Sequence, residues 1–104
     1  MIANLAWVVD SGATFDTVPL GYAIQEELQR IPLLNPIEIN TANGPAVAEH
    51  GVVLQLPGMP EYVCATEMPD SPALMSVGRR CMVHGYSFIW MAGREPYFLS
   101  LIHI

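Results

Sequence analysis

Proline and glycine interrupt this chain so often that no long helix fits between them. Its 104 residues include nine prolines and eight glycines, which end helices and favour turns. The runs between these residues have the length of strands and are rich in β-branched and aromatic side chains. The sequence therefore predicts a single, mostly β domain spanning residues 1–104, in which antiparallel strands predominate.

The clearest strand signals lie in the first half of the chain. The apolar run at residues 5–9 is expected to form a buried strand that ends at Asp10. Apolar and polar residues alternate over residues 37–41, and the pair Asn43-Gly44 that follows favours a tight hairpin turn. The returning strand is expected over residues 47–56. Further strands are predicted over residues 62–66, 73–77, 86–91 and 97–104.

Two short helices are expected between these strands. Ile24, Leu28 and Ile31 recur at helical spacing, which predicts an amphipathic helix over residues 22–30 that ends before Pro32. A second helix of one or two turns is expected over residues 80–84, with a glycine after it as a cap.

The charge balance argues against several classes of function. The net charge is −6 and the chain has only four Lys and Arg residues, whereas a phosphate-binding surface needs clustered cations. No apolar stretch approaches the roughly 20 residues that a membrane-spanning helix requires. The first residues lack the features of a signal peptide. We therefore expect no nucleic-acid or membrane partner, and a protein that stays inside the cell.

The low proportion of charged residues predicts a protein partner. Charged residues are 13% of the chain and hydrophobic residues 52%. Such a composition leaves more apolar surface than a small monomer usually exposes. We therefore expect the chain to form an oligomer.

The cysteines and histidines give no clear cofactor signal. Cys64 and Cys81 are too few for a disulfide framework and are expected to be reduced thiols in the core. Cys81 and His84 could form half of a zinc site, which His50 and His103 could complete, but no second paired motif supports it. No cofactor or metal is therefore expected.

The residues best suited to chemistry are Asp10, Ser11 and Gly12. An aspartate at the end of an apolar strand is held in place by that strand. The hydroxyl of Ser11 can stabilise the turn, and Gly12 lets the backbone approach the carboxylate closely. The tripeptide alone is also compatible with an ordinary turn.

Several further segments extend this motif into a resemblance. The sequence WVVDSGAT at residues 7–14 resembles the catalytic strand and loop of retropepsins, the aspartic proteases of retroviruses and retrotransposons, and is closest to the copia-type form. Residues 42–44 and 51–53 resemble the flap hairpin of that family. Residues 68–79, which end in Gly-Arg, resemble its closing strand and helix, and residues 85–88 resemble the strand that follows.

The resemblance implies a retropepsin-like closed β-barrel or sandwich with a flap hairpin and one or two short helices. It implies an aspartic endopeptidase that processes a polyprotein, of which the chain could itself be part. Two chains would form a homodimer, each supplying one catalytic Asp10. The flap over residues 37–56 would cover an extended peptide substrate. The implied substrate-binding residues are Ala13, Asn43, Gly44, Pro45 and Val77.

Two departures from the family pattern affect these expectations. Only nine residues precede Asp10, too few for the interface strand usual in retroviral members. We therefore expect residues 97–104 to help build the dimer, with packing inside their own monomer as the alternative. Thr14 occupies a position that is often acidic in the family, which leaves Asp16 as the nearest carboxylate and predicts an altered partner for Arg79.

Two other functions remain open at this stage. A domain of this type could serve as a dimerisation or peptide-binding module without catalysis, although the intact Asp10-Ser11-Gly12 favours activity. A small β-barrel could instead bind a metal or an apolar ligand through its Cys and His side chains.

Overall fold

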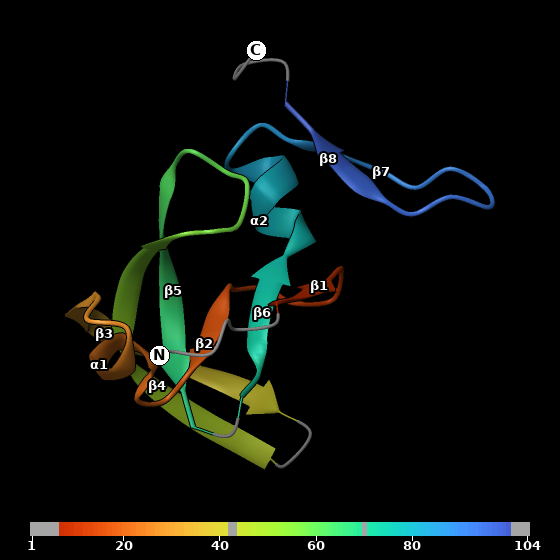
Figure 1. The fold of residues 1–104 in the computed structure, drawn as a ribbon. Helices are drawn as coiled ribbons and strands as arrows, with labels where there is room; N and C mark the ends of the chain where they lie inside the picture. Colours follow the sequence, from red (N-terminus) through yellow and green to blue (C-terminus); the bar gives the residue numbers. More distant parts are fainter. Residues whose placement is uncertain (1–6, 42–43, 70, 101–104) are drawn as a thin grey trace.

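A computed structural model describes residues 7–41, 44–69 and 71–100 and contains mostly strands, with two short helices (Figure 1). This confirms the predicted mostly β fold. In chain order the elements are β1 (Trp7–Asp10), β2 (Thr17–Pro19), α1 (Tyr22–Gln25), β3 (Gln29–Thr41), β4 (Gly44–Gln55), β5 (Tyr62–Met68), β6 (Ala73–Ser76), α2 (Val77–Met82), β7 (Ser87–Ile89) and β8 (Tyr97–Leu99).

Six of the strands form one mixed sheet in the order β1-β6-β2-β5-β4-β3, and β7 and β8 form a separate hairpin. The pairs β3–β4, β4–β5 and β7–β8 are antiparallel, as expected, whereas β1–β6 and β2–β5 are parallel. Among the described strands, β1 and β3 lie at the two edges of the large sheet. Its pairings therefore form an open order and do not close it into a barrel.

The predicted hairpin is present and begins earlier than expected. β3 and β4 pair in two stretches, separated by an irregularity between Pro32 and Ile37. Proline is tolerated in β3 because this strand lies at a sheet edge, where a missing N–H interrupts no second ladder. Leu34, in the irregular stretch, is fully exposed. The outer stretch of the hairpin runs from Ile37 to the turn.

The predicted helix over residues 22–30 is mostly wrong. Helix α1 ends at Gln25, and β3 begins at Gln29. Glu27 has a φ of 55°, which interrupts helical geometry, and the Leu28 N–H donates to the carbonyl of Ala23. Ile24 is 77% exposed, so the helical spacing of the apolar residues does not mark a buried face.

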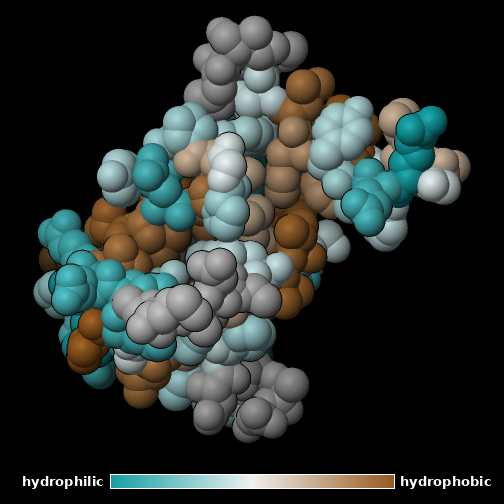
Figure 2. Space-filling view, viewed as in Figure 1, coloured by the Kyte–Doolittle hydropathy of each residue, from teal (hydrophilic) through white to brown (hydrophobic). Residues whose placement is uncertain are grey.

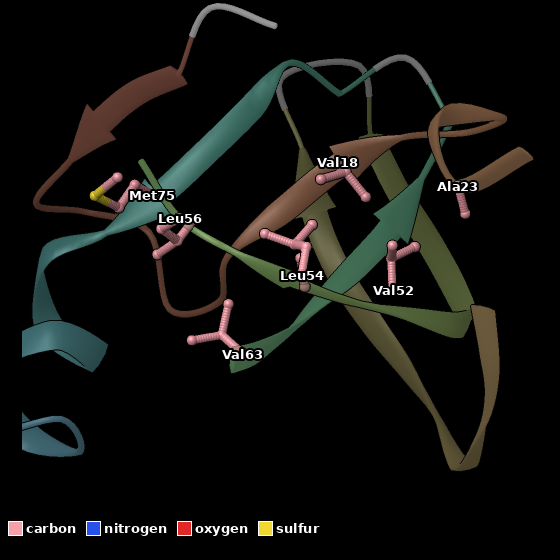
Figure 3. Packing of buried hydrophobic residues seen from close by; sticks show 8 residues of the cluster. Val18, Ala23, Val52, Leu54, Leu56, Val63 and Met75 are labelled. Carbon is pink, nitrogen blue, oxygen red and sulfur yellow. The ribbon is translucent and has the colours of Figure 1, made fainter. Parts of the chain in front are cut away.

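The core lies between the central strands of the large sheet. Val18 of β2 and Val52 of β4 are buried close to Leu54, and Met75 of β6 lies beside Leu56 (Figure 3). The strand predicted to be buried at residues 5–9 behaves differently, because Val8 and Val9 of β1 are each nearly half exposed. The buried cluster consists of Val18, Ala23, Val52, Leu54, Leu56, Val63, Ala65 and Met75.

Helix α2 and the β7–β8 hairpin complete the described chain. The hairpin extends away from the large sheet (Figure 1), and Phe98 packs against Tyr86 and Phe88 at its base. Within the segment predicted to build a dimer, strand β8 (Tyr97–Leu99) pairs with β7 of its own chain. Residues 101–104 lie outside the described residues. Neither described helix is long and apolar enough to cross a bilayer.

A pair of substitutions tests this assignment of core and surface. Leu54→Ala should lower the free energy of unfolding by about 2–5 kcal/mol, because Leu54 is only 4% exposed in the packed cluster. Ile24→Ala should change it by less than about 0.5 kcal/mol, because that side chain is exposed. Both values come from denaturant unfolding at one fixed protein concentration. Equal effects of the two substitutions would contradict the arrangement.

Candidate active site

The β1–β6 pairing fixes the position of Asp10. Asp10 is the last residue of β1, and its backbone lies in parallel register with Ser76, the last residue of β6. Its carboxylate is partly exposed and faces a cleft. The pairing of β1 with β6 therefore fixes the Asp10 backbone, while the carboxylate oxygens of Asp10 stay accessible to a ligand.

The turn after β1 organises the carboxylate itself. The Gly12 N–H donates a hydrogen bond of 2.8 Å to Oδ1 of Asp10. A Cβ atom at position 12 would lie 3.4 Å from that same oxygen, which is close to ordinary van der Waals contact. The backbone carbonyl of Asp10 also accepts a hydrogen bond from the Ala13 N–H at 3.4 Å. Gly12 thus contributes to the site through its N–H.

A buried ion pair holds the far end of the same loop. Asp16 and Arg80 are both almost completely buried. The two terminal nitrogens of Arg80 donate to the two carboxylate oxygens of Asp16, at 3.1 and 2.6 Å. Such a bidentate pair has a fixed geometry. It therefore joins the loop after Asp10 to helix α2.

Ser76 connects this ion pair to the Asp10 loop. Its backbone N–H donates to Oδ1 of Asp16 at 2.8 Å, and its hydroxyl donates to the carbonyl of Ala13 at 2.6 Å. The same hydroxyl accepts from the Arg79 N–H and so caps the N-terminus of α2. Ser76 thus holds both ends of the loop in place.

The arginine of the Gly-Arg motif has a different neighbour. The guanidinium carbon of Arg79 lies 5.9 Å from the centre of the Phe15 ring, a cation–π distance. Its neighbour Arg80, on another side of the same helix, pairs with Asp16. The sequence drew attention to Asp16 as the nearest carboxylate, but it did not indicate Arg80 as its partner.

A cleft of about 950 Å³ lies between the Asp10 loop and the β3–β4 hairpin. Its volume is at the upper end of the range for ligand-binding sites. Glu38, Asn40, Pro45 and Val47 of the hairpin line one side, and the Asp10 loop lines another. The remaining wall contains Met68, Pro69, Ser71, Pro72 and Leu74, and Thr17 fixes part of it by bonding Ser71 Oγ and the carbonyl of Pro72.

The structure brings most of the predicted site residues together. Ala13, Gly44 and Pro45 line this cleft with Asp10 and Gly12. Asn43 lies outside the described residues. Val77 does not line the cleft and instead borders a smaller hollow of about 210 Å³. Ser11 is exposed and borders that same hollow.

Other cleft residues were not singled out from the sequence. Phe15, Glu38, Met68 and Leu74 line the cleft, although none of them was predicted to bind a ligand. Met68 and Leu74 lie in the predicted closing segment, residues 68–79, and Glu38 lies in the predicted flap. For Glu38 a signal did exist, since it alternates with apolar residues in the predicted flap strand. The alternation placed Glu38 on one face of that strand, but it did not show that the face borders the cleft.

The cysteines do not form a competing site in the described residues. Both are free thiols, and Cys64 is exposed, so its predicted place in the core is wrong. Partial desolvation raises the pKa of the Cys64 thiol and Arg79 lowers it by less, which disfavours the reactive thiolate. Neither cysteine lines the cleft. Among residues 7–41, 44–69 and 71–100, no group of three His, Cys, Asp or Glu side chains is placed to hold a metal ion.

The buried ion pair leads to a stability prediction. Arg80→Met should lower the free energy of unfolding by about 3–5 kcal/mol, because it leaves the Asp16 carboxylate buried without its cation. The double substitution Asp16→Leu with Arg80→Met should be less destabilising than Arg80→Met alone. Arg94→Met, at an exposed position, serves as the control. A double variant as unstable as the sum of its two single variants would contradict the coupling.

Neither models of protein families, nor curated protein sequences, nor solved structures give a match to this chain. The likeness to retropepsins therefore depends on the motifs of the sequence.

Proposed function

We propose that this chain is an aspartic endopeptidase that acts as a homodimer. The observation that supports it most is the position of Asp10. Its carboxylate faces a cleft of peptide-binding size, directly after a strand and a glycine turn, with a hairpin on the opposite side. The biological role that fits such an enzyme is the processing of a polyprotein.

The mechanism requires two carboxylates that share one proton and hold a water molecule between them. The ionised carboxylate accepts a proton from the water, which attacks the peptide carbonyl. The protonated carboxylate donates to the carbonyl oxygen, and a proton then passes to the leaving nitrogen. Asp10 supplies one of the two groups.

A second copy of the chain supplies the other carboxylate. The sequence contains one Asp-Ser-Gly, and Asp10 is the only aspartate among the described residues that line the cleft. A two-fold axis places identical residues opposite each other. An axis that passes beside Asp10 would therefore complete the pair without any further catalytic residue.

Exposed apolar residues near Asp10 offer a surface for that second copy. Val8 and Val9 lie on the edge strand β1, and Trp90 lies in the β7–β8 connection with 73% of its surface exposed. In Figure 2, hydrophobic residues reach the surface on the right of the main body, whereas the projecting end of the β7–β8 hairpin is mostly hydrophilic or intermediate. The hollow between Val9, Trp90 and Phe88 could accept a side chain of the second copy.

The β3–β4 hairpin would act as the flap of this enzyme. Its outer part borders the cleft opposite the Asp10 loop. Backbone groups of such a hairpin can hydrogen-bond to an extended peptide, and its closure would exclude bulk water from the reacting carbonyl.

A peptide-binding or dimerisation module without catalysis is the alternative. The same cleft and the same apolar surface would serve it equally well. The intact Asp10-Ser11-Gly12, with the Gly12 N–H directed at the carboxylate, favours the enzyme. Turnover of a peptide separates the two functions.

Replacement of Asp10 by asparagine tests the catalytic role. Asp10→Asn should reduce peptide hydrolysis to about 1% or less of the original rate, because the amide keeps the shape but cannot act as a base. Hydrolysis is followed by mass spectrometry of a digested peptide library, with and without pepstatin. Glu95→Gln, at an exposed position in the β7–β8 connection, is the charge-matched control. Substantial turnover by Asp10→Asn would refute the assignment.

The shared proton predicts the pH dependence. Activity should be highest on the acidic side of neutrality and should fall as the pH rises, because the protonated member of the pair is then lost. A pH–rate profile with one peptide, measured from about pH 3 to pH 9, checks this. A rate that continues to rise into the alkaline range would indicate a different nucleophile.

The dimer surface can be tested separately from the chemistry. Trp90→Ser should weaken dimerisation at least about fivefold, because large buried aromatic residues dominate interfaces. Ile24→Ser is the control, since Ile24 is equally exposed but lies on α1, away from β1 (Figure 1). Sedimentation velocity over a concentration series gives both dissociation constants. Equal dimerisation of the two variants would exclude Trp90 from the interface.

A further inference from the structure

We propose that Glu38 makes this cleft select peptides that carry a lysine or arginine side chain. This inference rests on the proposed function, because it assigns a substrate preference to the same cleft. Glu38 would act as a specificity residue, since it lies on the hairpin and not in the Asp10 loop.

The strand register places Glu38 on the face of the hairpin that borders the cleft. Glu38 pairs with Val47, and Asn40 pairs with Pro45. Directly opposed residues of an antiparallel pair project to the same side, as do residues two apart on one strand. All four residues line the cleft. The Glu38 side chain therefore lies on a face of the hairpin that borders the cleft.

The charges around the cleft favour a cationic ligand. Asp10 and Glu38 are the only charged side chains among its described lining residues. Arg30 pairs with Glu67, Arg80 pairs with Asp16, and the guanidinium carbon of Arg79 lies 5.9 Å from the centre of the Phe15 ring. Glu38 takes part in neither the Arg30–Glu67 pair nor the Arg80–Asp16 pair. A carboxylate in such a cleft attracts a peptide cation and repels an acidic side chain.

The neighbouring surface suits the long stem of a lysine or arginine. Phe15, Met68 and Val47 give the cleft apolar walls. Lysine and arginine pack their methylene groups on apolar surface while the charged end reaches a polar partner. In a two-fold dimer, one Glu38 would lie on each side of the cleaved bond. The preference should therefore occur at two positions of the substrate, one on either side.

The experiment uses a position-scanning library of uncharged decapeptides in which one position at a time carries Lys, Gln or Glu. The measured quantity is the ratio of kcat/KM for Lys over Glu at each position. The unsubstituted enzyme should show a ratio of about five at two positions, the effect of an ion pair that stays partly open to water. High salt should reduce this ratio.

Three variants assign the effect to one carboxylate. Glu38→Gln should bring the ratio close to one, and Glu38→Lys should invert it. Glu49→Gln should leave it unchanged, because Glu49 is an exposed carboxylate on the same hairpin that does not line the cleft. A ratio that is the same in Glu38→Gln as in the unsubstituted enzyme would overturn the inference, as would the absence of any preference.

A binding measurement separates this inference from the proposed function. The same peptides are titrated against Asp10→Asn by fluorescence anisotropy, because Glu38 is then the only charged side chain of the described cleft lining. If no peptide is hydrolysed, the proposed enzymatic function fails, and the binding measurement alone tests the preference assigned to Glu38. Tighter binding of Lys peptides that disappears in Asp10→Asn with Glu38→Gln supports the inference. Equal binding of Lys and Glu peptides, or no binding, overturns it.

Discussion

The buried pair of Asp16 and Arg80 is the interaction on which the geometry of the site depends. Two charges removed from water are tolerated only when they are paired and hydrogen-bonded, and Asp16 provides that partner for Arg80. The pairing fixes helix α2 against the loop that begins at Asp10. Ser76 then adds bonds to both Asp16 and Ala13. The loop after Asp10 is therefore tied to β6 at Ala13 and to α2 at Asp16.

The hairpin side of the cleft is held much less firmly. Residues 51–55 of β4 pair with β5, whereas residues 44–48 pair only with β3 among the described strands. The outer half of the hairpin thus forms a two-stranded ribbon, which is only marginally stable without further support. Under the proposed function, this ribbon would be the part of the flap with the least support from the sheet.

Local sequence signals predicted the β3–β4 hairpin. The features that the sequence did not predict depend on contacts between residues far apart in the chain. Alternation and the Asn43-Gly44 pair act within a few residues, so the turn between β3 and β4 could be located. The helical spacing of Ile24 and Leu28 was also local, but the backbone reverses at Glu27 and the chain joins a sheet edge instead. Asp16 and Arg80 are 64 positions apart. The contact between Asp16 and Arg80 depends on where α2 packs against the loop after Asp10, and no short sequence motif indicates that position.

The apolar surface of β1 and the single catalytic carboxylate have a common explanation under the proposed function. The sequence predicted a buried strand at residues 5–9, yet Val8 and Val9 are nearly half exposed at a sheet edge in the isolated chain. An exposed apolar edge strand promotes association. Asp10 directly follows Val9, so a two-fold axis that passes beside the end of β1 would bring two copies of Asp10 near each other. Under the proposed function, the exposed apolar surface of β1 would be buried in the dimer interface, and the same interface would supply the second catalytic carboxylate.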